Sequence, residues 1–298
     1  MGINTEMYRI LSYLQSHKLL TGKKSVVELG AQVISAHKNS LETVQKKLGM
    51  SDVKPPTTAI ELYRQFGLID FCCVDAGGSL AENKVIADLN RPLQAQWKGF
   101  RTFDVVTNLG TSEHCFDQVS VFRNIHDMCA EGGLMIHQLC TQGLVNHGYY
   151  NYHPRFVYEM AQANGYEIVK IWFTVDFMSQ LIEYNLDDFY LHDDRDLMIY
   201  TVLRKRYDRP FRLPFDSIFD EENQLEDYKQ SQSIKDKEFD AYIKATWLNA
   251  TAPDAFRRMP PRRLFKKIIR DTKRNAYFIK TQMIIAIKKH FLGQKINQ

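Results

Sequence analysis

Hydrophobic residues between positions 25 and 203 gather in short runs, and amphipathic or polar stretches separate these runs. Runs rich in Val, Ile, Leu and Phe are typical of strands that are buried on both faces. We expect strands at residues 25–29, 70–74, 85–87, 103–108, 131–137, 166–173 and 197–203, and helices at residues 4–20, 57–66, 116–130 and 153–164. Strands that alternate with helices at this spacing predict an α/β fold: a doubly wound, mostly parallel, seven-stranded sheet with an N-terminal helix.

Breaks in the pattern divide the chain into three parts. Gly22 follows the opening helix, and after Arg204 the alternation of strands and helices stops. The polar, Lys-rich stretch that ends at Pro56 is interpreted as a linker inside the sheet domain. We therefore expect an N-terminal helix at 1–22, a sheet domain at 23–204 and an extension at 205–298.

The extension ends in a basic segment. Residues 256–298 hold 13 Lys and Arg and one acidic residue, Asp271, and apolar residues return at helical spacing over 262–292. This pattern predicts an α-helix that packs on the protein or a partner subunit, lies on an anionic membrane surface, or binds nucleic acid. Nucleic acid is the weakest of the three, because no recognised binding motif or stacking platform of aromatic residues accompanies the charge.

Composition indicates a protein of the cytoplasm. The chain has 298 residues, 44% of them hydrophobic, no apolar run of the roughly 20 residues that span a bilayer, and no secretory leader. The five cysteines form no C-x-x-C pair, so we expect free thiols. Residues 1–203 carry 17 basic and 23 acidic side chains, whereas 204–298 carry 22 and 12. The basic extension could hold the protein at the inner face of a membrane.

Polar and small residues follow the predicted strands. Glu28 and Gly30 end the first strand, Asp75 ends the second, Asp88 follows the third, and Gly110 follows the fourth. The carboxyl ends of parallel strands meet at one edge, which is where open α/β sheets bind ligands. We expect these side chains to lie close together at such a site.

This succession resembles the class I S-adenosylmethionine-dependent methyltransferases over about residues 22–203, and the resemblance implies a Rossmann-like fold with S-adenosyl-L-methionine as cofactor. In that family, the turn after the first strand lies against the amino acid end of the cofactor, an acidic residue after the second strand binds the ribose, and residues after the third contact adenine. The positions that match, in chain order, are Glu28, Gly30, Gln32, Asp75, Asp88, Leu89, Asn108 and Gly110.

The first turn departs from the family pattern. Gly30 is followed by Ala31 and Gln32 rather than by further glycines, and Gln32 is expected to supply an amide contact instead. A non-catalytic relative is therefore an alternative, although a module that binds no donor would not need carboxylates at three strand ends. The chain has no G-x-G-x-x-G of nicotinamide enzymes, no P-loop, and no signature of DNA amino-methyltransferases. A nucleic-acid-directed methyltransferase that uses the basic tail is a further alternative.

The loop at 141–154 is dense in His, Tyr and Asn and should face the donor methyl group. Transfer to oxygen needs a base, for which histidine is suited. The loop is similar to one in methyltransferases linked to bacterial surface polysaccharide or sugar modification, which implies a sugar, glycan or other small-molecule hydroxyl as acceptor. The candidate bases are His147, then His114 and His137, and the expected acceptor contacts are Glu113, Tyr149, Tyr150 and Asn151.

An acidic run at 187–194 could ligate a divalent cation through its carboxylates. Such runs are more often solvated loops. We therefore predict no metal.

Overall fold

The computed structural model describes residues 2–77, 83–176, 180–185, 189, 192, 195–214 and 272. The chain divides into two compact units, Met1–Asp236 and Lys237–Gln298, and Thr272 is the only described residue of the second. The helices of the first unit are α1 (Thr5–Ser16), α2 (Lys38–Lys47), α3 (Ala59–Gln65), α4 (Leu93–Gln96), the 3-10 helix η1 (Ser112–His114), α5 (Gln118–Met128) and α6 (Pro154–Asn164). Its strands are β1 (Ser25–Leu29), β2 (Asp70–Asp75), β3 (Lys84–Ile86), β4 (Phe103–Leu109), β5 (Cys129–Gln142), β6 (Tyr166–Val175), β7 (Ile182–Glu183) and β8 (Leu197–Lys205).

The strands form one sheet in the order β3-β2-β1-β4-β5-β8-β6-β7. Pairs from β3 to β5 are parallel, whereas β8 runs antiparallel to both β5 and β6. The expected mostly parallel, Rossmann-like sheet is therefore present, but with eight strands among the described residues rather than seven. The additional strand β7 has two residues, which is too short for a hydrophobic pattern to reveal it.

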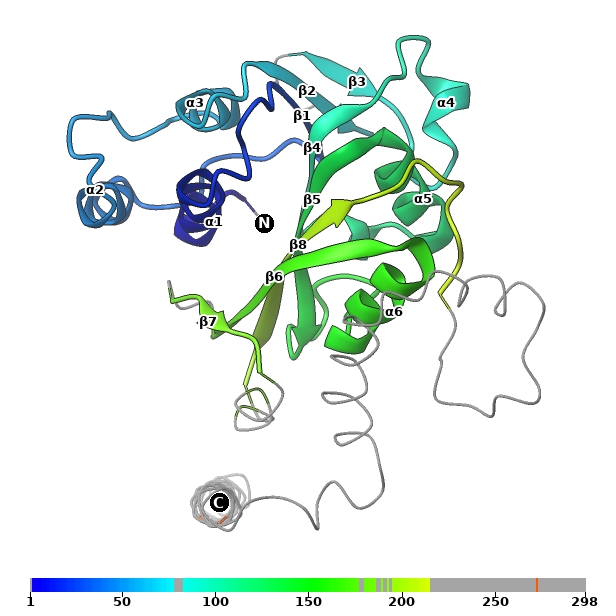
Figure 1. Cartoon of the computed structure of the whole chain (residues 1–298). Coiled ribbons are helices and arrows are strands. Elements are labelled where there is room, and N and C mark those ends of the chain that lie inside the picture. The colour runs from blue at the N-terminus through cyan, green and yellow to red at the C-terminus, as the bar shows by residue number, and fades with distance from the viewer. Residues whose placement is uncertain are drawn as a thin grey trace, which may run out of the picture. The chain divides into compact units, whose positions relative to one another are not determined.

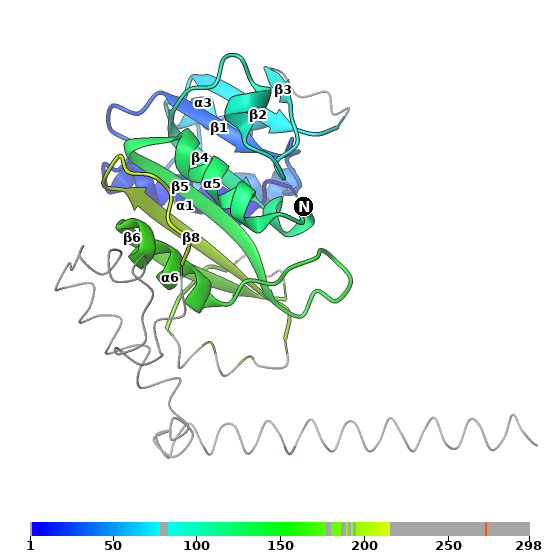
Figure 2. The same ribbon diagram turned by 90° about the vertical axis from the view of Figure 1, so that its right-hand side faces the viewer.

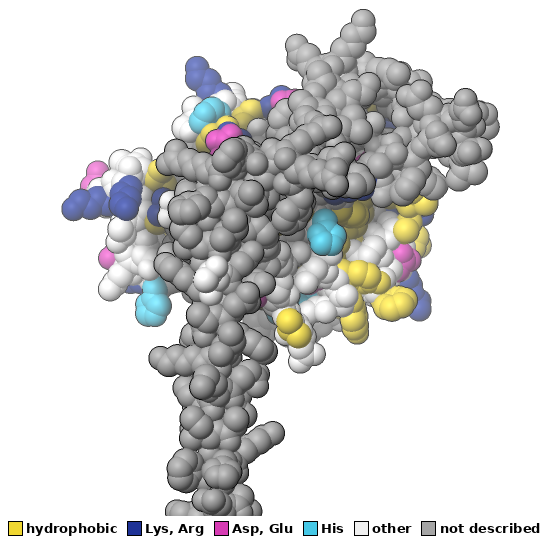
Figure 3. All heavy atoms as spheres, turned by 90° about the horizontal axis from the view of Figure 1, so that it is seen from below, with side chains coloured by type: hydrophobic (Ala, Val, Ile, Leu, Met, Phe, Trp, Pro, Cys, Tyr) yellow, Lys and Arg dark blue, Asp and Glu magenta, His cyan; other side chains and the backbone are white. Residues whose placement is uncertain are grey.

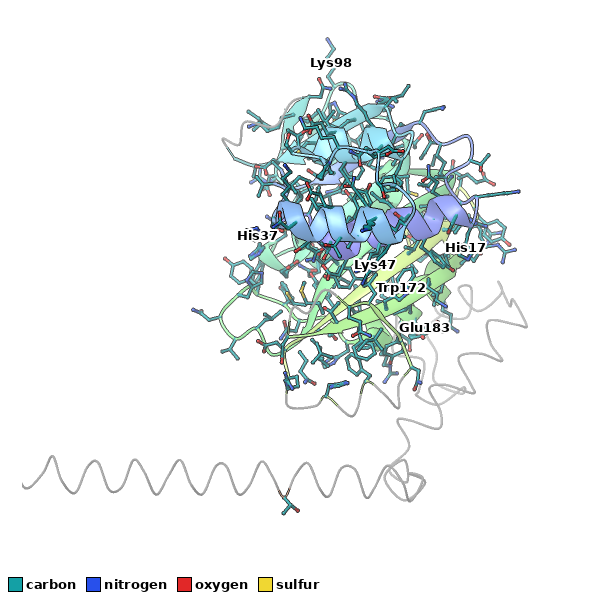
Figure 4. All side chains as sticks on the ribbon, turned by 90° about the vertical axis from the view of Figure 1, so that its left-hand side faces the viewer. His17, His37, Lys47, Lys98, Trp172 and Glu183 are labelled. Carbon is teal, nitrogen blue, oxygen red and sulfur yellow. The ribbon has the colours of Figure 1, made fainter. Side chains whose placement is uncertain are left out.

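Helices cover both faces of the sheet. Helices α1, α2 and α3 lie on one side, and α4, α5 and α6 lie on the other (Figure 1; Figure 2 looks onto the second side). Both faces are thus shielded from water, which explains why β4 is buried along almost its whole length. Figure 4 looks onto the first side, where α1 and α2 cross the sheet, with His37 and His17 near opposite ends of the pair.

The opening helix belongs to the main core. Asn4 caps it by accepting a hydrogen bond from the backbone N–H of Met7 at 3.1 Å, and the side chains of Met7, Leu11 and Leu14 are fully buried. These residues share one hydrophobic cluster with residues of β1, β4 and β5. Burial against the sheet, rather than helix propensity alone, stabilises α1.

The polar stretch before Pro56 is not simply a linker, because it contains α2. This helix buries little more than Leu41, Val44 and Gln45, and so narrow an apolar stripe gives a weak periodic signal. At the other end of the unit, residues 206–214 follow β8 without forming a helix or strand, and Arg212 exchanges two hydrogen bonds with Asn164 of α6.

Two further predictions concern segments that the structure barely describes. The basic helix at 262–292 lies outside the described residues except for Thr272, and the acidic run at 187–194 does so except for Phe189 and His192. In the described part of the chain, no helix is both long enough and apolar enough to span a membrane.

Candidate functional site

The order of strands reverses between β1 and β4, and the loops that follow these two strands meet there. Thr111 joins the loops, because its hydroxyl donates to the carbonyl of Leu29 at 2.7 Å and lies 3.3 Å from Nε2 of Gln32. Gly30 has φ +71°, and a Cβ at this position would lie 2.6 Å from Oγ1 of Thr111. Only glycine fits such a close approach without a shift of the neighbouring loop.

Glu28 fixes the backbone of the Gly30–Gln32 turn through hydrogen bonds. Its Oε1 accepts a hydrogen bond from the backbone N–H of Gln32 at 2.9 Å, and its Oε2 accepts one from the hydroxyl of Tyr63 at 2.9 Å. The side chain is 1% exposed, and burial raises its pKa to about 8 even though both hydrogen bonds favour the ionised form. Glu28 therefore acts on the site through the backbone of the turn.

Asp75 faces the same turn from β2. Its Oδ2 accepts from the backbone N–H of Ala31 at 2.7 Å, and its Oδ1 accepts from the backbone N–H of Gly77 at 2.6 Å. An ionised carboxylate has about four acceptor positions, so each oxygen can accept a further hydrogen bond. Because the side chain is partly exposed, these positions are within reach of a ligand hydroxyl.

Asp88 and Leu89, which follow β3, differ in their exposure to solvent. Asp88 is half-exposed, and hydrogen bonds from the backbone and side chain of Asn90 lower its pKa. Leu89 is 5% exposed, and its carbonyl accepts from the side-chain amide of Asn124. The structure therefore leaves the Asp88 carboxylate available to a ligand and buries the Leu89 side chain.

Asn108 and His137 are internal supports. Asn108 is fully buried, accepts from the backbone N–H of Ser112 at 3.1 Å and donates to its hydroxyl at 2.9 Å, which fixes the start of η1. Nδ1 of His137 lies 3.3 Å from the Asn108 amide, and burial lowers the pKa of this histidine to about 4. At 4% exposure, His137 has little access to a bound acceptor, unlike the other two candidate bases. Gly110, with φ +72°, donates its backbone N–H to the carbonyl of Gln138.

Glu113, His114 and His147 form a second cluster at this edge. One ligand-type atom from each lies within 4.8 Å of the others, and Nε2 of His147 is 3.8 Å from Oε1 of Glu113. The Glu113 side chain is fully buried, and burial raises its pKa. Burial and the neighbouring His147 lower the pKa of His114, whose ring meets that of His147 edge to face at 5.0 Å. Helix α5 and strand β5 separate His147 from Glu113 and His114 in the sequence, and the fold brings the three side chains together.

The loop after β5 is fastened at several points to hold His147 there. Leu144 and Asn146 have φ of +50° and +69°; this left-handed conformation costs Leu144 roughly 1–2 kcal/mol, whereas asparagine tolerates it better. The carboxylate of Asp196 accepts from the backbone N–H of Leu144, and the backbone N–H of Tyr149 donates to the carbonyl of Glu113 at 2.8 Å. The strained turn thus presents His147 to Glu113.

The expected acceptor contacts have different environments. The hydroxyl of Tyr150 donates to the carbonyl of Phe116, and the amide of Asn151 donates to the carbonyl of Gly143, so both side chains brace the loop. The ring of Tyr149 is 70% exposed and packs edge to face on Phe116, which is 76% exposed. Tyr149 is therefore the member of the set that is free to contact a ligand.

Exposed apolar side chains are frequent at the carboxyl edge. Those that end or follow β1, β3, β4 and β5 are Val33, Ile86, Phe116, Val145 and Tyr149, each at least 70% exposed. Figure 3 shows hydrophobic side chains exposed close to a histidine on the face seen from below. Among these side chains, Phe116 and Tyr149 pack on each other, and such exposed apolar surface often marks an interaction site.

Several residues that position the site could not be predicted from the sequence. Tyr63 lies on a helix and belongs to no motif, and Asp196 lies 52 residues after Leu144, whose backbone it anchors. Thr111 had a signal in its position, because it directly follows Gly110 at the end of a strand. These residues act on the site through others.

No protein-family model and no curated protein matches the chain. Solved structures with a similar fold include three methyltransferases. The StiE O-methyltransferase is 12% identical with a TM-score of 0.37, over 68% of this chain and 75% of that chain. A Bacillus halodurans methyltransferase is 9% identical with a TM-score of 0.40, over 66% and 99%. The 1,6-didemethyltoxoflavin N1-methyltransferase of Burkholderia thailandensis, solved with S-adenosylhomocysteine, is 11% identical with a TM-score of 0.38, over 66% and 77%. At these values the likeness assigns no reaction to this chain.

Proposed function

We propose that this protein is an S-adenosylmethionine-dependent methyltransferase that methylates a hydroxyl group of a sugar, a glycan or another small molecule. One observation carries the proposal: the short segment after β4 contacts both halves of the site. Thr111 touches the Gly30–Gln32 turn, and Glu113, two residues further on, faces His147. A donor held at the turn and an acceptor held at His147 would therefore be neighbours.

The residues on the donor side fit the cofactor. Oε1 of Gln32 is buried and has no hydrogen-bond partner among the residues that the structure describes, so it can accept from the ammonium group at the amino acid end. Close packing at Gly30 leaves backbone, rather than a side chain, facing that end. The carboxylate of Asp75 has acceptor positions left for a ribose diol, and Asp88 can accept from the adenine amine. Bound there, S-adenosylmethionine supplies an electrophilic methyl group.

His147 is the group that takes the proton of the acceptor hydroxyl. Its Nε2 is buried beside Glu113 and has no hydrogen-bond partner in the described protein, whereas the side chain as a whole is 30% exposed, so an acceptor can reach the ring. Glu113 stabilises the resulting imidazolium from 3.8 Å, an interaction strengthened by the burial of the carboxylate. The proton then passes from His147 to solvent. A positioned general base contributes typically about 10²–10⁴-fold to a rate.

The rim of the site favours an acceptor with an apolar face and hydroxyl groups. The exposed rings of Tyr149 and Phe116 offer apolar surface together with one phenolic hydroxyl. A sugar ring presents C–H groups on its faces and hydroxyls at its edge, which suits such a rim. This is the observation that supports a sugar or glycan over a wholly apolar acceptor.

A transfer assay tests the proposal. The full chain is incubated with radiolabelled S-adenosylmethionine and a panel of sugar nucleotides and glycan fragments. The variant His147→Asn is assayed in parallel with the control His37→Asn, because His37 is exposed and lies far from His147 in the sequence. We expect transfer to a panel member, a loss of about 10²–10⁴-fold in His147→Asn with binding of S-adenosylhomocysteine retained, and no change in the control. Donor binding without transfer to any member would count against the acceptor class. Failure of the folded protein to bind the donor would favour a non-catalytic module.

A further inference from the structure

The Glu113–His114–His147 cluster has the composition of a metal site. Glu113 and His114 come from η1, and His147 comes from the loop after β5. One ligand-type atom of each side chain lies within 4.8 Å of the others, and the described residues offer no second such group of three. Two imidazoles and one carboxylate are a ligand set that binds zinc and other divalent transition metals.

Two buried atoms of the cluster have no hydrogen-bond partner in the described protein. Glu113 is 0% exposed, and its Oε2 has no hydrogen-bond partner in the described protein. Nε2 of His147 is also buried without a hydrogen-bond partner. A buried carboxylate oxygen left unpaired is costly, and a cation would satisfy it together with the imidazole nitrogen.

The geometry requires little movement. Ligand atoms at 2.0–2.2 Å from a tetrahedral ion are about 3.3–3.6 Å apart, compared with 3.8 Å between Glu113 and His147 and at most 4.8 Å within the cluster. The exposed His114 and the partly exposed His147 can rotate by that amount, whereas Glu113 is fixed. Three protein ligands leave one position open to water or to an acceptor hydroxyl.

We propose that Glu113, His114 and His147 bind one divalent transition-metal ion, with zinc as the best match to the ligand set. Metal coordination at Nε2 of His147 removes the lone pair that would otherwise accept a proton. If His147 acts as the base, as the proposed function has it, the loss of this lone pair makes the metal-loaded protein a slower methyltransferase than the metal-free protein. The site itself does not depend on that reaction.

Cobalt(II) titration tests the site without any methyl donor. The full chain, first dialysed against chelator, is titrated with Co²⁺ while the visible d–d absorption is recorded, and Zn²⁺ is then added to displace the cobalt. We expect one equivalent with the strong absorption of a tetrahedral site and without the intense near-ultraviolet band of thiolate ligands. Glu113→Gln, His114→Asn and His147→Asn should each weaken binding by at least about 10–100-fold, whereas His37→Asn should bind as the unaltered protein does.

Each outcome decides the proposal. Absence of the tetrahedral spectrum, a thiolate band, or equal binding by His147→Asn and the unaltered protein would overturn it. Far-ultraviolet circular dichroism establishes that each variant is folded, and His114→Asn alters an exposed side chain if Glu113→Gln fails to fold. The proposed function fails separately: cobalt binding in a protein that binds no S-adenosylhomocysteine keeps the metal site and rejects the methyltransferase.

Discussion

Ionisation of Glu28 should make the folded protein less stable at high pH. The Glu28 carboxyl is 1% exposed, and burial raises its pKa from an ordinary value of 4.5 to about 8. In the unfolded chain the group loses its proton near 4.5, so between about pH 4.5 and 8 the folded state binds more protons than the unfolded state. Stability therefore falls as the pH rises through this window.

The size of the effect follows from the two pKa values. One unit of pKa corresponds to about 1.36 kcal/mol, so the rise from 4.5 to about 8 gives a loss of up to about 5 kcal/mol by pH 9. A loss of this size is a large part of the roughly 5–15 kcal/mol that stabilises a typical protein. Glu28→Gln removes the titrating group and keeps nearly the same shape.

Urea unfolding at several pH values between 5 and 9 measures the difference. We expect the free energy of unfolding of the unaltered protein to fall by several kcal/mol more than that of Glu28→Gln over this range. The control is Glu61→Gln, because Glu61 is exposed and hydrogen bonds from Thr57 lower its pKa, so its titration lies below the range. The same pH dependence in Glu28→Gln and the unaltered protein would refute the reasoning.

Three further substitutions test separate parts of the account. Asp75→Asn should weaken S-adenosylhomocysteine binding by about 10–100-fold in calorimetric titration, since hydrogen bonds to a charged group are worth about 1.5–3 kcal/mol; unchanged affinity would remove Asp75 from the donor site. Tyr149→Ala should raise the KM for the acceptor and change the unfolding free energy by less than about 0.5 kcal/mol, because its ring is 70% exposed; an unaltered KM would show that the ring does not contact the acceptor. Leu14→Ala should lower the unfolding free energy by about 2–5 kcal/mol in urea, because Leu14 is fully buried; a cost below 1 kcal/mol would mean that α1 is not part of the core.

The hydrophobic pattern was sufficient to predict most of the sheet, because central strands buried on both faces read as continuous apolar runs. It located β1, β2, β3, β4, β6 and β8 within two residues at each end, and it predicted β5 with an end five residues too early. It could not reveal α2, whose apolar stripe is narrow, or β7, which exists only through its pairing with β6. Both depend on tertiary contacts more than on local sequence.

The sequence predicted where the residues of the candidate site lie better than it predicted what each residue does. Strand ends identified Gly30, Asp75 and Glu113, because the carboxyl ends of parallel strands share an edge. The hydrophobic pattern could not predict the surroundings of a polar side chain within a strand. His137 was therefore a candidate base, although it is buried in the sheet beside Asn108. The approach of His147 to Glu113 depends on a strained loop turn that residue types alone do not specify.

The most direct test of the account is whether the Gly30 turn binds the methyl donor. Gly30 and Gly49 have nearly the same φ, +71° and +72°, so alanine imposes a similar backbone cost at each. A Cβ at Gly30 would press on Thr111, whereas nothing lies within 4 Å of one at Gly49. Calorimetric titration with S-adenosylhomocysteine should give micromolar binding for the unaltered protein and for Gly49→Ala, and none for a folded Gly30→Ala. Equal binding by both variants, or no binding by the unaltered protein, would contradict a donor site at this turn.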